Sequence, residues 1–197
     1  MTADPFTDAL AIAVSFTGLL ERLGIPYLVG GSVASSVHRE PRSTNDIDIV
    51  ADIRPENLDA FVEAVSPDYY VSPTAALQAV RSGASFNVIH VGAAVKVDLF
   101  VAGSDPFNEE RLRQRRLIEI SDDPPASIYV DTAEHSVLRK LECFRGGREV
   151  SDRQWRDVVA ILRLQGESLS RPHLTKWADR LGVSDLLERA LAEARPG

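Results

Sequence analysis

Asp46 and Asp48 lie two residues apart in a segment where polar and apolar side chains alternate. Ile47 and Ile49 fill the positions between and after them, which is the period of a β-strand. Residues two apart on a strand share one face, so both carboxylates point one way while the isoleucines enter the core. Two like charges this close repel, and a hard divalent cation with oxygen ligands is the usual means of neutralising them. The segment therefore predicts a half-buried strand with a metal-binding face.

A second alternating segment, residues 94–101, carries one more carboxylate. Asp98 stands between Lys96 and Phe100 on the face opposite the valine and leucine side chains. If this strand pairs beside the Asp46 strand, three carboxylates converge and can hold two metal ions, one orienting a triphosphate and one activating a hydroxyl. Mg²⁺ is the expected ion, with Mn²⁺ as a substitute, because Mg²⁺ keeps coordination positions open for water and phosphate.

A glycine-rich turn precedes the paired aspartates. Gly30, Gly31 and Ser32 follow a short apolar strand over 26–29 and open a helix expected to run to about Arg39. Glycines let the backbone approach a phosphate closely, and a helix N-terminus offers N–H groups and a positive dipole. Each motif alone is a common surface feature. Their order along the chain is the stronger signal, and it predicts a site for a metal-bound polyphosphate.

The remaining patterns predict an α/β N-terminal part, called the front part below, and an all-helical C-terminal part, called the rear part. Asp122 to Pro125 is interpreted as a linker, so the expected domains are residues 1–125 and 126–197. The further strands expected in the front part are 68–71, 85–89 and 117–120, and its helices are 9–23, 55–65, 73–80 and 106–116. The helices expected in the rear part are 132–144, 152–164, 171–181 and 184–193.

Charge and cysteine content limit the classes of function and the cellular compartment that the sequence allows. The 197-residue chain has a net charge of −7, and residues 1–110 carry 6 Lys/Arg against 15 Asp/Glu, which argues against non-specific nucleic-acid binding by the whole surface. The arginines from Arg111 to Arg116 suit either a solvated helix face or a grip on a polynucleotide. A lone Cys143 excludes an internal disulfide, and we expect it to pack on an apolar helix face. Without a membrane span or basic leader, the sequence predicts a cytoplasmic protein.

Together these motifs resemble the polymerase-beta-like nucleotidyltransferase superfamily. Its hallmark is an apolar residue with Gly-Gly or Gly-Ser, then Asp-x-Asp and a later acidic strand residue, which here are Val29 to Ser32, Asp46 with Asp48, and Asp98. The resemblance covers about residues 26–165. It implies an α/β (α+β) fold in which a mixed sheet flanked by helices is followed by a C-terminal helical bundle.

Within the superfamily, residues 42–48 resemble the minimal nucleotidyltransferases and the AbiEii-like toxin group. Residues 138–144 look like the helix after the catalytic domain, where Lys140 takes the place of a phosphate-binding lysine, and Asp157 either orients Lys140, acts as a base or forms an ordinary helix pair with Arg153. Asp46, Asp48 and Asp98 are then the catalytic and metal-binding residues. The nucleotide-binding residues implied are Gly30, Gly31, Ser32, Arg42, Thr44, Lys140 and Asp157.

The resemblance implies transfer of a nucleoside monophosphate from an NTP to an acceptor hydroxyl. The toxin-like context favours tRNA or another RNA as acceptor, with an antitoxin protein as partner. An aminoglycoside-type small molecule is the alternative, because a polycation suits an acidic cleft, and a protein hydroxyl is a third. A non-catalytic nucleotide-binding regulatory module is the hypothesis from another class, and retention of all three carboxylates favours the enzyme.

Overall fold

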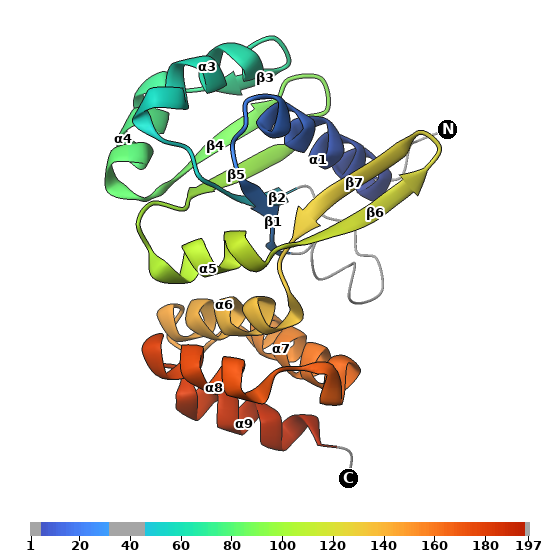
Figure 1. Ribbon diagram of the computed structural model, residues 1–197, viewed down its shortest axis with the longest axis vertical. Coiled ribbons are helices and arrows are strands. Elements are labelled where there is room, and N and C mark those ends of the chain that lie inside the picture. Colours follow the sequence, from blue (N-terminus) through green and yellow to red (C-terminus); the bar gives the residue numbers. More distant parts are fainter. Residues whose placement is uncertain (1–4, 32–45, 196–197) are drawn as a thin grey trace. The chain divides into compact units, whose positions relative to one another are not determined.

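The computed structural model describes residues 5–31 and 46–195, with the backbone alone for residues 5–8. The chain divides into two compact units, Met1–Val130 and Asp131–Gly197, which are described separately (Figure 1). In the described residues no helix is both long and apolar enough to cross a bilayer.

The first unit is built on a mixed sheet with the strand order β3-β4-β5-β2-β1-β7-β6. Strand β2 pairs antiparallel with β1 and parallel with β5, and β4 joins β5 antiparallel. The bounds of the strands are β1 Tyr27–Val29, β2 Asp46–Ala51, β3 Tyr69–Val71, β4 Ser85–His90, β5 Lys96–Val101, β6 Arg116–Asp122 and β7 Pro125–Val130. This mixed sheet with flanking helices confirms the predicted fold class.

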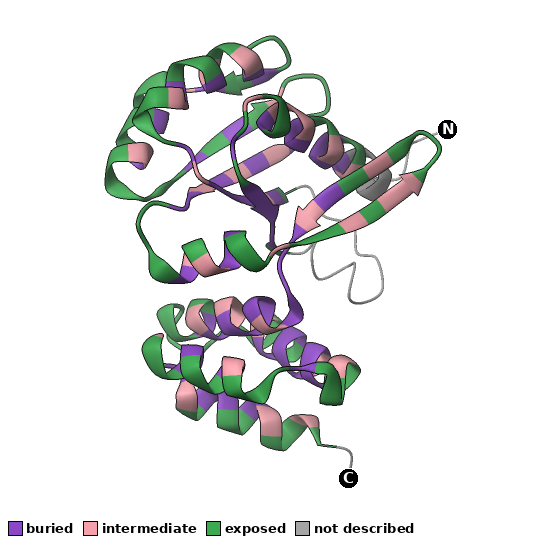
Figure 2. Ribbon diagram, in the orientation of Figure 1, coloured by how far each residue is buried: buried purple, intermediate pink, exposed green. Residues whose placement is uncertain are grey.

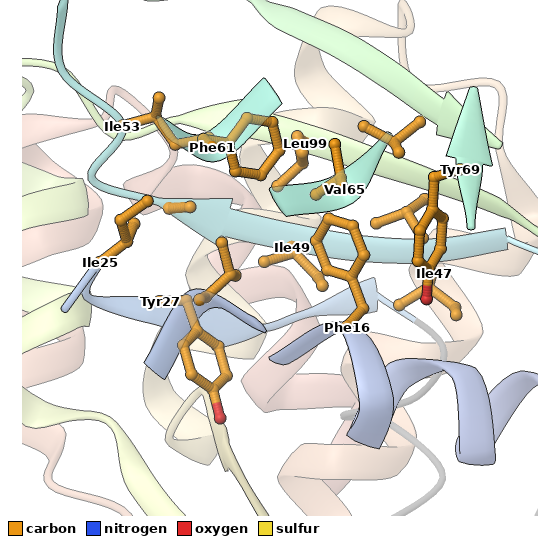
Figure 3. Packing of buried hydrophobic residues seen from close by; sticks show 14 of the residues in the cluster. Phe16, Ile25, Tyr27, Ile47, Ile49, Ile53, Phe61, Val65, Tyr69 and Leu99 are labelled. Carbon is orange, nitrogen blue, oxygen red and sulfur yellow. The ribbon is translucent and has the colours of Figure 1, made fainter. Parts of the chain in front are cut away.

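Three helices cover one face of the sheet and enclose its main core. They are α1 (Pro5–Arg22), α3 (Pro55–Val65) and α4 (Pro73–Ser82). Phe16 of α1 makes edge-to-face contacts with Phe61 and Tyr69 at centroid distances of 6.3 and 5.1 Å, over the isoleucines of β2 (Figure 3). Ile47, Ile49, Val97 and Leu99 are fully buried, as their alternation predicted. The carboxylates between them must therefore lie on the other face.

The other face is covered at one end by α5 (Pro106–Gln114). Leu112 of this helix packs with Leu28, Val50 and Ala102 in a small apolar cluster. The buried and half-buried positions alternate along β5, and Figure 2 shows them in two colours. Because Val50 is apolar and Asp46 exposed, β2 has an apolar end under α5 and a polar beginning open to solvent.

The second unit is helical in its described residues, as predicted. Its helices are α6 Ala133–Gly146, α7 Asp152–Gln165, α8 Arg171–Arg180 and α9 Ser184–Ala194. The Thr132 hydroxyl caps α6 by accepting from the His135 N–H, and Ser151 caps α7 in the same way. Trp155 and Trp177 are only 8% and 5% exposed, so both belong to the core of this unit.

Two expectations differ from the structure. Residues 122–125 form the turn of the β6–β7 hairpin instead of a linker, and the boundary between the units lies at Val130, five residues beyond the predicted one. The fully buried side chains of Ile128 and Val130 anchor β7 in the sheet. Pro125 is tolerated because it is the first residue of this strand. Cys143 is exposed, so its predicted packing is wrong.

Candidate active site

The register of β2 against β5 brings the three predicted carboxylates onto one patch of the sheet. Asp48 lies directly beside Asp98, and Asp46 lies beside Lys96. Neighbouring strands are about 4.8 Å apart, so the Asp48 and Asp98 side chains start from adjacent positions on the same face. Alternation had placed each carboxylate on a polar face, and the parallel pairing now joins the two faces. What these carboxylates bind stays a prediction.

Lys96 connects the two strands through their carboxylates. Its Nζ lies 2.8 Å from Asp98 Oδ2 and 3.5 Å from Asp46 Oδ1. The hydrogen bond to Asp98, with the negative charge of both aspartates, raises the pKa of Lys96 above its ordinary value. From the sequence alone, Lys96 was only a neighbour of Asp98 on the same strand. The available signal was its position two residues before Asp98, which puts both on one face of β5.

The Gly30-Gly31 turn packs directly against Asp48. The Gly30 N–H donates to the Asp48 carbonyl oxygen at 2.8 Å. Gly31 has φ +59°, and a Cβ built there would overlap the Asp48 carboxylate. Position 31 therefore requires glycine for two reasons: its backbone is left-handed, and the Asp48 carboxylate leaves no space for a Cβ. Because the Gly30 N–H already donates to the Asp48 carbonyl oxygen, it is not free to donate to a phosphate.

Arg111 lies against the same turn and was misread from the sequence. It is 3% exposed, so it does not belong to a solvated, polynucleotide-gripping face. Its Nη1 donates to Asn108 Oδ1 at 2.9 Å, its guanidinium carbon lies 5.7 Å from the Phe107 ring centre, and its Nη2 would be 3.8 Å from a Cβ at Gly30. Arg111 follows the buried Phe107 by four residues, and this helical spacing was the signal for its inward face.

The other predicted nucleotide-binding residues fall into two groups. Ser32, Arg42 and Thr44 lie outside the described residues. Lys140 and Asp157 belong to the second unit, where Lys140 Nζ contacts Asp157 Oδ2 at 3.1 Å and the side chains are 12% and 9% exposed. The structure thus brings Lys140 and Asp157 together, as the resemblance implied, by pairing α6 with α7.

The chemistry of the donor set suits a hard divalent cation. Three carboxylates stand on adjacent strands beside the Gly30-Gly31 turn, and carboxylate oxygens are the ligands that Mg²⁺ prefers. Over residues 5–31 and 46–195, no three His, Cys, Asp or Glu side chains are gathered at metal-binding spacing. Two of the aspartates contact Lys96 instead. Asp46, Asp48 and Asp98 stay the candidate metal ligands. The Lys96 ammonium lies between two of them, Asp46 and Asp98.

This sheet, with a glycine turn against one strand and aspartates on two, has the nucleotidyltransferase fold. No protein-family model and no curated protein sequence matches the chain. Solved structures do match it in fold. An antigenic nucleotidyltransferase-like protein from Paracoccidioides brasiliensis aligns with a TM-score of 0.53 at 18% identity, covering 94% of this chain and 93% of that one.

Two further solved structures share the fold. The structure of ANT(2″)-Ia in complex with adenylyl-2″-tobramycin has a TM-score of 0.55 at 12% identity and covers 89% of this chain and 97% of its own. A putative nucleotidyltransferase from Thermotoga maritima has a TM-score of 0.51 at 15% identity and covers 77% and 94%. At these identities the likeness establishes the fold of the chain.

Proposed function

We propose that this protein transfers a nucleoside monophosphate from an NTP to an acceptor hydroxyl and releases pyrophosphate. The observation that carries the proposal is the in-register pairing of Asp48 with Asp98 directly beside the Gly30-Gly31 turn. A polyphosphate needs a close backbone approach, and its metal needs carboxylates at the same place. The turn and the carboxylates lie together on one patch of the sheet, which supports the proposal.

Asp46, Asp48 and Asp98 are the residues that would hold Mg²⁺ or Mn²⁺. A bound divalent cation would offset phosphate charge and favour ionisation of the attacking hydroxyl. In the reaction, the hydroxyl oxygen bonds to the α-phosphorus while the bond from that phosphorus to pyrophosphate breaks. Asp98 is the carboxylate we assign to favour loss of the hydroxyl proton. By resemblance, Arg42 is assigned to balance charge on the phosphates.

The acceptor we favour is a small polycation with a hydroxyl group. Residues 1–110 carry nine more acidic than basic side chains, 15 against 6. This excess of negative charge attracts a cationic acceptor. ANT(2″)-Ia, which shares the fold, was solved with an adenylylated aminoglycoside. An RNA acceptor with a partner antitoxin is the second candidate, and it is supported by the resemblance of residues 42–48 and 138–144.

The test is a transfer assay on the purified chain with Mg²⁺ and each α-labelled NTP. An aminoglycoside panel, total small RNA and extract protein are offered separately as acceptors. We expect label on an aminoglycoside with the native chain and none with the Asp46→Asn, Asp48→Asn double variant. Asp59→Asn, which changes an exposed carboxylate of α3, is the matched control and should transfer normally.

The other outcomes decide between the alternatives. Label on RNA alone would replace the small-molecule acceptor by the toxin-like reaction. Equal transfer by the double variant would refute the carboxylate mechanism. NTP binding with no transfer to any acceptor class would indicate the regulatory module.

A further inference from the structure

Lys96 stands where the two carboxylate-bearing strands meet. It is paired in register with Asp46 and lies two residues before Asp98, so all three side chains share one face. Its ammonium contacts one oxygen from each strand, Asp98 Oδ2 at 2.8 Å and Asp46 Oδ1 at 3.5 Å. A cation that joins carboxylates of two adjacent strands is the arrangement expected of a metal ion in this site. Here a side chain of the protein supplies the positive charge.

The surroundings of Lys96 allow its ammonium to leave. The Lys96 side chain is 37% exposed, against 61% for Asp46 and 19% for Asp98, so water reaches the ammonium and can replace its Asp46 contact. A lysine is a compact charge on a flexible stem and is not fixed in a two-pronged contact as an arginine is. Exposed ion pairs of this kind contribute little to folding. Their main effect is to neutralise the carboxylates.

We propose that Lys96 is an internal counter-ion that competes with the divalent cation for Asp46 and Asp98. The inference rests on the metal-binding part of the proposed function. Without nucleotide, the ammonium lowers the affinity of the carboxylates for metal. The negative charge of a bound triphosphate draws the ammonium away, so metal and nucleotide bind cooperatively. Because binding linkage is reciprocal, the same lysine makes nucleotide binding depend on metal.

The test measures Mn²⁺ binding without following the reaction. The full chain is titrated with Mn²⁺ in the absence of nucleotide, and free Mn²⁺ is read by electron paramagnetic resonance. Lys96→Met and Lys96→Gln should each tighten binding by about tenfold or more, because each removes a positive charge that competes for the same carboxylate oxygens; tenfold corresponds to about 1.4 kcal/mol. Lys176→Met, which removes an exposed lysine of the second unit, should bind Mn²⁺ as the native chain does.

A triple variant shows where the gained metal binds. Adding Asp46→Asn and Asp48→Asn to Lys96→Met should abolish the gain. A non-hydrolysable NTP should tighten Mn²⁺ binding to the native chain and do so less in Lys96→Met. Unchanged or weaker Mn²⁺ binding by both Lys96 variants overturns the proposal, and so does a gain that survives in the triple variant.

The experiments can refute the role of Lys96 and the transferase function independently of each other. If the native chain transfers nucleotide but the Lys96 variants bind Mn²⁺ as before, only the role of Lys96 is wrong. If the Lys96 variants gain Mn²⁺ at the aspartates while no NTP is used, the carboxylates bind metal and the transferase function is wrong.

Discussion

Lys96 and Lys140 both contact aspartates, but their surroundings differ. Lys96 shares its charge between Asp98 and Asp46 on an open sheet face, and its side chain is 37% exposed. Lys140 contacts Asp157 between two packed helices, and both side chains are about one-tenth exposed. A charge pair removed from water depends on its partner, whereas an open pair exchanges its partner for water at low cost. The first contact therefore suits ligand exchange and the second suits a fixed structure.

The largest expected effect is on the open site. Asp98→Asn should lower kcat by about 10²–10³-fold, the usual loss when one charge-stabilising group is removed from an active site. Urea unfolding of this variant should match that of the native chain, because Asp98 lies on the polar face of β5, away from the main core. The Asp59→Asn control should change neither quantity. A variant that unfolds early would instead make Asp98 a structural residue.

The buried pair should show the opposite behaviour. Lys140→Met removes the ammonium that contacts Asp157 at 3.1 Å in a nearly buried pair between α6 and α7, and the free energy of unfolding should fall by about 3 kcal/mol. Urea denaturation followed by far-UV circular dichroism measures this loss. Lys176→Met provides the control, because Lys176 is exposed, and it should unfold as the native chain does. A native-like Lys140→Met would mean that the pair contributes no stability.

A pair of glycines separates backbone strain from damage to the site. Gly31→Ala and Gly24→Ala each place an alanine at positive φ, +59° and +65°, and each should cost about 1–2 kcal/mol of stability. Only at Gly31 would the new Cβ overlap the Asp48 carboxylate, since nothing lies within 4 Å of one at Gly24. Gly31→Ala should therefore also lose transfer activity, while Gly24→Ala keeps it. Equal activity in the two variants would contradict the close packing of the turn on Asp48.

The smallest expected effect is the stability change in Lys96→Met. An exposed ion pair contributes less than about 1 kcal/mol, so the urea midpoint should stay close to that of the native chain. Comparison with Lys140→Met under the same conditions is the direct measure of how the two contacts differ. A loss as large as that of Lys140→Met would show that Lys96 holds β2 and β5 together.

Much of the fold followed from local patterns. The helix expected over 55–65 begins and ends as predicted, since a proline at its first turn and apolar helical spacing both mark it. Strands β2, β4 and β5 appear where alternation placed them. The hairpin at 122–125 was missed because a turn with two prolines resembles a linker until a buried strand is seen to follow it.

The candidate site was predictable in its residue types but not in its contacts. Asp46, Asp48 and Asp98 could each be placed on a polar face, because side-chain direction along a strand depends only on position. For Arg111 the only signal of burial was its spacing from Phe107, and for Lys140 the partner Asp157 was implied only by the family resemblance. A long cationic side chain on a helix can point to solvent or lie along apolar surface, so helical spacing alone does not say whether it is buried.

The sequence by itself determined most of the strands and helices, with β7 as the exception, and which side of β2 and β5 carries charge. These are local properties, set by the two-residue period of a strand and the helical period of about 3.6. Only the tertiary structure decided that β5 lies parallel beside β2 with Asp48 against Asp98, and that Lys96 joins the two strands. It also decided that the Gly31 backbone lies against Asp48. Such contacts join residues far apart in the chain, and they depend on which surfaces pack together and exclude water.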